Sequence, residues 1–154
     1  MTNDNIVIKV QQQDFDLGEE MNKLHQNNVD DGATATFCGR VRNNNLEQDV
    51  IGLYLEHYPQ MTEKQLLQIA QQAKSKWHLG RVCIIHRIGM LNVGEQIVFV
   101  GVTSKHRQSA FMACEFIMDF LKVKATFWKK EVHANGQKLW LDAKQSDQNK
   151  ANSW

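Results

Sequence analysis

Short stretches in which apolar residues alternate with polar ones, or follow one another, predict a sheet. Between Thr34 and Arg42 the two kinds alternate, which places Arg40 and Arg42 together on the face opposite Phe37. Residues 97–102 are apolar on both faces, so we expect this strand at the centre of the sheet, covered on both sides. The predicted strands are Ile6–Val10, Thr34–Arg42, Val50–Tyr58, Val82–Ile88, Ile97–Thr103, Phe127–Val132 and Lys138–Asp142.

Three other stretches have apolar residues at the spacing of a helix. A short helix is predicted after the capping box that begins at Asp16. The clearest helix follows the only proline of the chain. Thr62 is its predicted N-cap, Gln65 completes a capping box, and Gly80 ends it. The third helix is predicted over Gln108–Leu121, with these side chains turned inward: Phe111, Cys114, Ile117, Met118 and Leu121.

Together these elements predict one α+β domain with a mixed or antiparallel sheet and about three helices. A length of 154 residues suits a single domain with its own core. We expect that domain to cover residues 1–143 and the polar residues 144–154 to form a flexible tail. No run of about 18 apolar residues predicts a membrane span, and the N-terminus lacks the pattern of a secretory signal. The expected location is therefore the cytoplasm.

The three cysteines are odd in number and far apart, which argues against a disulfide framework or a cysteine-based zinc site. Each lies among apolar neighbours and is interpreted as a buried thiol. The six histidines never fall at the spacing of metal ligands, and His57 and His86, inside predicted strands, are interpreted as structural. The signatures of nucleotide-binding loops and of serine hydrolases are absent.

The net charge of the chain is only +1, which argues against a general nucleic-acid binder. The distribution is uneven, however. Residues 32–46, 96–114 and 120–130 contain no acidic residue and carry a local charge of +8, so the rest of the chain carries −7. Residues 64–94 are acid-free too, and their lysines are interpreted as the solvent face of a helix. Charge segregation alone leaves a functional site and an ordinary solvated surface equally open.

Basic residues gather in three clusters where strands and helices begin or end: Arg40/Arg42, His106/Arg107 and Lys122/Lys129/Lys130. Arginine binds phosphate or carboxylate through paired hydrogen bonds, and the start of a helix favours an anion. Lysines beside other cations can change pKa and take part in acid–base or covalent chemistry. The residues alone thus predict a site for a small phosphate-bearing anion that allows catalysis. For Lys122, an interaction with the helix dipole remains an alternative.

Five segments, in order and almost without gaps, match the pattern of one known family: TATFCGRVR (34–42), LEHYPQMTEK (55–64), VCIIHRIG (82–89), VGEQIVFVGVTSKHRQSAF (93–111) and FIMDFLKVKATFWKKE (116–131). They resemble the large, catalytic subunit of molybdopterin synthase, the MoaE family. The resemblance covers the chain from about residue 30 to residue 145.

The resemblance implies an α/β-hammerhead fold, a homodimer, and a sulfurtransferase that needs no metal or other cofactor and has no nucleic-acid or membrane partner. Each large subunit of the family binds one small, ubiquitin-like sulfur carrier, a MoaD-like subunit, which gives a heterotetramer. The carrier's C-terminal Gly-Gly ends in a thiocarboxylate that enters a pocket of the large subunit. There it delivers sulfur to cyclic pyranopterin monophosphate. Two transfers, with opening of the cyclic phosphate, yield the dithiolene of molybdopterin in molybdenum cofactor biosynthesis.

The resemblance also implies roles for single residues. The family's catalytic lysine, in the helix-ending D-[YF]-L-K motif, corresponds to Lys122, and its second lysine corresponds to Lys129. We expect Lys122 to hold the thiocarboxylate and donate a proton, and Lys129 to stabilise the developing charge. The implied substrate-binding positions are Arg40, Val41, Arg42, His106, Arg107, Lys122, Lys129, Lys130 and Glu131.

Three positions depart from the family pattern. Thr126 stands where the pattern has proline, which is expected to loosen the loop before Trp128. Lys124 stands where it has arginine. Lys144 also replaces a common arginine, which weakens any bidentate phosphate contact there. None of these changes removes a proposed catalytic group, so we expect an active enzyme.

Two other functions remain as alternatives. Aromatic and basic residues are interleaved in KVKATFWKK (122–130), as in modules that bind nucleotides or RNA. A non-catalytic scaffold that only binds the carrier would show the same resemblance. Strong, salt-dependent RNA binding would identify the first alternative, and carrier binding without formation of molybdopterin would identify the second.

Overall fold

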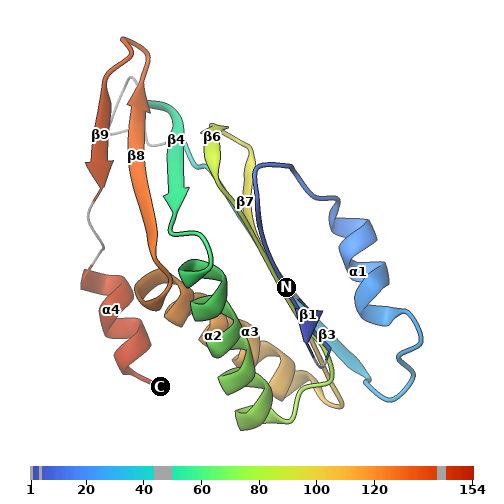
Figure 1. Ribbon diagram of the computed structural model, residues 1–154. Helices are drawn as coiled ribbons and strands as arrows, with labels where there is room; N and C mark the ends of the chain where they lie inside the picture. The colour runs from blue at the N-terminus through green and yellow to red at the C-terminus, as the bar shows by residue number, and fades with distance from the viewer. Residues whose placement is uncertain (1, 4, 44–49, 142–144) are drawn as a thin grey trace.

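The fold consists of two sheets and four helices, which a computed structural model describes for residues 2–3, 5–43, 50–141 and 145–154 (Figure 1). The α+β class and the mixed sheet are confirmed. The described elements form two sheets instead of one, and they include one helix more than expected. The predictions for Asp142 and Lys144 lie outside the described residues.

The main sheet has the strand order β1 (Thr2–Asn3), β2 (Ile6–Gln11), β5 (Val82–Arg87), β7 (Gln96–Ser104) and β3 (Ala33–Arg40). Strands β2 and β5 are parallel, and the other neighbours are antiparallel. Strand β5 is buried along its whole length, and β7 is buried from Val98 onward. As predicted, β7 is covered on both sides, by α1 (Leu17–His25) and by α3 (Arg107–Lys124), but the central strand is β5, and β7 lies between it and the edge strand β3 (Figure 1).

Helices α2 (Met61–Trp77) and α3 (Arg107–Lys124) lie on one face of the main sheet, and α1 (Leu17–His25) lies on the other (Figure 1). The largest core fills the space between α2, α3 and the sheet, where each fully buried aliphatic side chain contributes about 1.5–3 kcal/mol. Its fully buried members include Ile8, Leu66, Ile84, Val100 and Ile117. A smaller core lies under α1: Phe15, Leu24, Cys83, Ile85 and Phe99. None of the described helices is long and apolar enough to cross a membrane.

The second sheet has the strand order β6 (Gly89–Asn92), β4 (Val50–His57), β8 (Phe127–His133) and β9 (Lys138–Leu141), all antiparallel. Its strands pack mainly against one another, and the sheet stands beyond the ends of α2 and α3 (Figure 1). Only Ile88 separates β5 from β6, so the chain passes directly from one sheet to the other. A buried cluster lies at this junction and consists of Val41, Leu55 and Leu91.

The predicted capping residue is confirmed for α1, where it is Asp16, and is wrong for α2. The Asp16 carboxylate accepts the Glu19 N–H at 2.9 Å, as a capping residue does. Helix α2 begins before Thr62, which lies in its first turn. The Thr62 hydroxyl donates to the Thr126 carbonyl at 2.7 Å and accepts the Tyr58 N–H at 3.0 Å. The Thr62 side chain, which the local pattern predicted as an N-cap, thus binds Thr126, a residue far away in the sequence.

Helix α3 extends beyond its predicted bounds at both ends. Of the side chains expected to face inward, Cys114, Ile117 and Leu121 are buried, and Met118 packs against the core. The prediction for Phe111 is wrong, because its side chain is 66% exposed. Phe111 lies beside β3, the edge strand of the main sheet, where it lines an open groove.

The segment expected to be a flexible tail contains a helix, α4 (Gln145–Asn152), which packs on α3. Trp154 lies edge-on against Trp77 and Phe116, and its indole N–H donates to the Asp119 carboxylate at 2.7 Å. Ala151 is buried as well. The prediction of a flexible tail rested on the polar composition of this segment, which reflects its exposed residues. Ala151 and Trp154 hold the segment in place, but two isolated apolar residues produce no periodic signal in the sequence.

The end of α2 also differs from the prediction. His78, with φ 52° and ψ 52°, takes the left-handed capping conformation that was expected of glycine. Gly80 serves a different purpose, because a Cβ at this position would collide with the Asp31 carboxylate. That carboxylate accepts the Thr103 hydroxyl at 2.8 Å. Glycine is therefore needed at position 80 for space.

Gly80→Ala should lower the free energy of unfolding by about 1–3 kcal/mol, because the added methyl group displaces the Asp31 carboxylate. His78→Gly should leave it unchanged or raise it, since glycine adopts the left-handed conformation without steric cost. Urea unfolding midpoints of both variants and the wild type test the pair. A Gly80→Ala midpoint equal to that of the wild type would contradict the steric explanation.

Candidate functional site

A buried histidine lies where the two sheets meet. His86 of β5 is 3% exposed, and its ring stacks on Phe127 of β8 with the centroids 3.8 Å apart. Burial lowers the pKa of His86 to about 3, against the opposing effect of its hydrogen bond with the Arg87 carbonyl. The positive charges of Lys129 and Lys122 lower this pKa further. Both lysines thus lie on the same side of the molecule as His86.

Lys122 lies at one end of an open groove between β3, α3 and α4. The groove has a volume of about 400 Å³. Phe37, Phe111 and Met118 form part of its apolar lining. Its charged lining consists of two cations and three carboxylates: Lys122, Lys150, Glu115, Asp119 and Asp147. Lys122 is exposed in the last turn of α3. Its ammonium group is therefore accessible to a ligand in the groove as well as to the helix dipole.

Lys129 and Lys130 point to opposite faces of β8, because side chains alternate along a strand. Lys129 lies opposite Leu55, which is 1% exposed, so its face turns toward the body of the molecule. Lys130 lies on the other face, with its Nζ 4.1 Å from the centre of the Trp140 ring. Glu131 shares the face of Lys129. Among the three predicted binding residues of β8, Lys129 and Glu131 thus share a side and Lys130 does not.

The predicted arginine pair lies at the end of β3, on either side of a buried valine. Arg40 is exposed, and its Nε donates to the Gly94 carbonyl at 3.1 Å. Val41 is 3% exposed, and both of its backbone groups are bonded to the turn before β7. Arg42 is exposed beyond the strand. The prediction that both arginines share one strand face is wrong, because β3 ends at Arg40 with a register shift after Gly39.

The third basic cluster lies at the opposite end of the molecule. His106 and Arg107 are exposed at the start of α3, whereas Lys122 lies in its last turn. The rise of a helix places Arg107 and Lys122 roughly 22 Å apart along the axis. Helix α3 follows β7 and returns along β3, so Arg40 lies at the Lys122 end. Within one chain, the cluster of Arg40 therefore lies at the same end as the cluster of Lys122, and the cluster of Arg107 lies at the other end. The prediction that all three clusters form one site is wrong for a single chain.

The loop before β8 is held in place, contrary to the loosening expected from Thr126. This residue is the second of the two that separate α3 from β8. Its N–H donates to Gln65 Oε1 at 2.7 Å, and its carbonyl accepts the Thr62 hydroxyl at 2.7 Å. A proline could not make the first of these bonds. The capping box predicted for Thr62 and Gln65 is wrong for the same reason, because both side chains hold Thr126.

Two residues of the segment 55–64 border the site, although the sequence pattern assigned them no role there. His57 lies opposite Phe127 in the sheet, and its positive form acts on His86. Its Nε2 lies 3.7 Å from Glu63 Oε1. The resemblance of this segment to the family was the signal that could have indicated them. In the described part of the chain, no three His, Cys, Asp or Glu side chains gather as metal ligands would.

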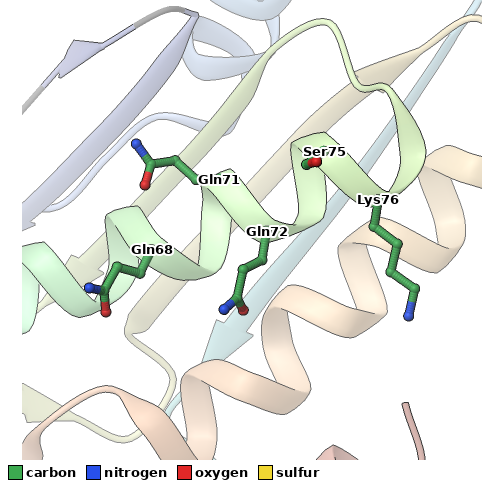
Figure 2. A pocket seen from close by; sticks show the side chains of 5 residues that line it. All are labelled: Gln68, Gln71, Gln72, Ser75 and Lys76. Atoms are coloured by element: carbon green, nitrogen blue, oxygen red, sulfur yellow. The ribbon is translucent and has the colours of Figure 1, made fainter.

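A second, shallow hollow of about 670 Å³ lies on α2 (Figure 2). Its lining side chains all come from this one helix and do not converge on a common point: Gln68, Gln71, Gln72, Ser75 and Lys76. Lys76 is the only charged group among them, and its Nζ lies 4.9 Å from the centre of the Trp77 ring. Reaction sites bring several chemical groups together, so the groove beside Lys122 is the better candidate.

Comparisons with known proteins find relatives over nearly the whole chain. The sequence profile described as "MoaE protein" matches residues 10–124, a range that includes Lys122 and ends before Lys129. The chain is 53% identical over 147 residues to a protein of Escherichia coli named molybdopterin synthase catalytic subunit. That match covers 96% of this chain and 97% of the relative.

Solved structures that superimpose on the chain carry similar names. A molybdopterin biosynthesis MoaE protein from Burkholderia ambifaria superimposes with a TM-score of 0.82 and 43% identity, covering 97% of each chain. A chain of molybdopterin synthase from Staphylococcus aureus superimposes with a TM-score of 0.78 and 29% identity, covering 92% of this chain and 98% of its own.

His86→Phe should remove a pH dependence of stability. The folded protein lowers the pKa from 6.5 to about 3, so between these values only the unfolded state binds the proton. The stability due to the neutral ring is full above pH 6.5 and is lost as the pH falls, by about 2 kcal/mol between pH 7 and pH 5. Phenylalanine keeps an aromatic stack and does not titrate. Urea unfolding at pH 7 and pH 5 measures the free energy of unfolding at each pH. Its decrease from pH 7 to pH 5 should be smaller in the variant by about 2 kcal/mol, and an equal decrease in both proteins would contradict the low pKa of His86.

Proposed function

The chain belongs to the MoaE protein family, and we propose that it performs the reaction of that family between Lys122, in the groove at the end of α3, and Lys129 of β8. It is a sulfurtransferase, the catalytic subunit of a molybdopterin synthase. It transfers sulfur from the C-terminal thiocarboxylate of a small carrier subunit to cyclic pyranopterin monophosphate and forms the dithiolene of molybdopterin. The observation that carries the site assignment is the place of Lys122 in the groove at the end of α3, which only two residues join to β8, the strand of Lys129.

The groove beside Lys122 receives the extended C-terminal end of the carrier. Between Phe111 and Lys122, α3 borders the groove for roughly 16 Å, the length of about five extended residues. Its apolar lining favours a chain end without charged side chains, and the Gly-Gly end implied by the family resemblance has none. Lys122 then meets the terminal thiocarboxylate as an ion pair.

The site has to bring two anions together, a thiocarboxylate and a cyclic phosphate. Their repulsion is of order 4 kcal/mol at about 4 Å with an effective dielectric near 20. Each charge-assisted hydrogen bond from a lysine offsets roughly 1.5–3 kcal/mol of it. Lys122 is exposed in the free chain, so its interaction strengthens when the bound carrier excludes water.

The two lysines have different tasks. Lys122 holds the thiocarboxylate and donates a proton, since it lies in the groove that the carrier enters. Lys129 stabilises the charge that develops on the phosphate oxygen as the ring opens, which favours the transition state over the bound substrate. Arg40 and Arg42, at the same end of the molecule, bind the phosphate or the pterin. His86 remains neutral and adds no charge to this set.

A second copy of the chain completes the site. His106 and Arg107 lie at the far end of α3 from Lys122 and cannot reach the same substrate within one chain. A twofold dimer can bring the start of α3 from one copy to the groove of the other. With one carrier on each copy, the assembly is a heterotetramer. The cytoplasmic location expected from the sequence stays a prediction.

Lys122→Ala should lower the rate of molybdopterin formation by about 100-fold or more, because it removes both the anion partner and the proton donor. Reconstitution with thiocarboxylated carrier and cyclic pyranopterin monophosphate measures it. Lys124→Ala, on the same exposed turn, is the matched control and should keep the wild-type rate. Near-normal turnover of Lys122→Ala would overturn the catalytic assignment.

Lys122→Ala and Arg107→Ala should complement each other when their dimers are allowed to exchange subunits. Each variant alone should be inactive. In a statistical mixture half of the dimers are mixed, and one of their two sites has both residues intact, so about a quarter of the wild-type activity should return. Native mass spectrometry verifies the exchange. Mixed dimers without any recovery would rule out a site shared between two copies.

A further inference from the structure

The two lysines of the site belong to different parts of the molecule. Lys122 lies on α3, which packs against the main sheet, whereas Lys129 lies on β8 of the second sheet. The strands of the second sheet pack mainly against one another, beyond the ends of α2 and α3 (Figure 1). The separation of the two ammonium groups therefore depends on the few contacts that fix β8 to the rest of the fold.

Thr62 of α2 makes hydrogen bonds next to two strands of the second sheet, after the end of β4 and before the start of β8. Thr62 is fully buried, and its hydroxyl donates to the Thr126 carbonyl at 2.7 Å, just before β8. The same oxygen accepts the Tyr58 N–H at 3.0 Å, just after β4. Gln65, one turn further along α2, accepts the Thr126 N–H at 2.7 Å. Both backbone polar groups of Thr126 are thus held by α2, three residues before Lys129.

We propose that Gln65, together with Thr62, is a positioning residue for sulfur transfer: by holding Thr126 against α2, it sets the place of Lys129 relative to Lys122. The inference rests on the proposed function, in which both lysines act on one reacting pair. Gln65 acts through Thr126 and not on the substrate.

Small displacements matter at this point because the stabilisation of charge requires fixed geometry. A misplacement of about 1 Å can lower a rate on the order of 100-fold. Phe127, between Thr126 and Lys129, also holds β8 through its stack on His86. A stacked pair is favourable over a range of offsets, whereas a hydrogen bond weakens steeply away from good geometry. The bonds to α2 therefore define the start of β8 more sharply than the stack does.

The same position can be fixed in a second way, which separates positioning from general stability. Proline at position 126 has no N–H to satisfy and holds its own φ near about −65°. Ala125, the preceding residue, has φ −84° and ψ 133°, the extended conformation that residues before proline favour. Thr126→Pro should therefore be accommodated and should make the Gln65 side chain unnecessary.

The test measures kcat and KM of the complete synthase with thiocarboxylated carrier and cyclic pyranopterin monophosphate. Gln65→Ala should lower kcat about tenfold or more and change KM for the pterin by less than about threefold. Gln65→Ala combined with Thr126→Pro should keep kcat within about threefold of Thr126→Pro alone. Gln71→Ala, an exposed glutamine of the same helix, is the matched control and should equal the wild type (Figure 2).

Gln65→Glu keeps an acceptor for the Thr126 N–H and should retain at least about half of the wild-type kcat. If Thr126→Pro does not fold, the comparison of Gln65→Glu with Gln65→Ala tests the positioning role instead. A Gln65→Ala kcat within about twofold of wild type overturns the inference, and so does an equal loss in Gln65→Ala, Gln65→Glu and the double variant. Lys129→Ala separates the two proposals. Normal kcat for it overturns the role of Lys129 and this inference together, whereas an inactive Lys129→Ala beside a fully active Gln65→Ala overturns this inference alone.

Discussion

The arrangement of the site depends on the contacts that join the second sheet to the rest of the fold: the hydrogen bonds of Thr62 and Gln65 to Thr126, and the stack of His86 on Phe127. The stack joins a strand of the main sheet to a strand of the second sheet, whose strands otherwise pack mainly against one another. Burial keeps the imidazole neutral, so the contact does not add a third positive charge beside Lys122 and Lys129. A protonated ring at this place would repel both lysines and would cost the desolvation of a buried charge.

The length of α3 imposes the second constraint. A rigid helix carries Arg107 at its start and Lys122 in its last turn, so the basic residues of one chain are divided between two ends of the molecule. This division keeps like charges apart in the isolated chain, where their repulsion would be uncompensated. It is also the reason why the proposed site takes His106 and Arg107 from a second copy of the chain.

Local patterns were reliable where the partner of a residue is close in the sequence and failed where it is distant. Asp16 caps the helix that it precedes, because the N–H groups it satisfies follow directly. Thr62 and Gln65 form the same kind of pattern, yet they bind Thr126 of another element. Gly80 was assigned to a helix end, but the nearness of the Asp31 carboxylate requires it. In each wrong prediction the group that the residue contacts lies in a segment distant in the sequence, which a local sequence pattern does not include.

The sequence by itself determined the class of fold, most strands and three helices, because hydrophobic periodicity reports directly which face of an element is buried. It also determined the family, through motifs whose order and spacing are preserved in the chain. Only the tertiary structure decided the division into two sheets, the anchoring of residues 145–154 by Trp154, and the separation of the basic clusters. These features depend on the direction in which elements turn back on one another, and neither composition nor spacing records that direction.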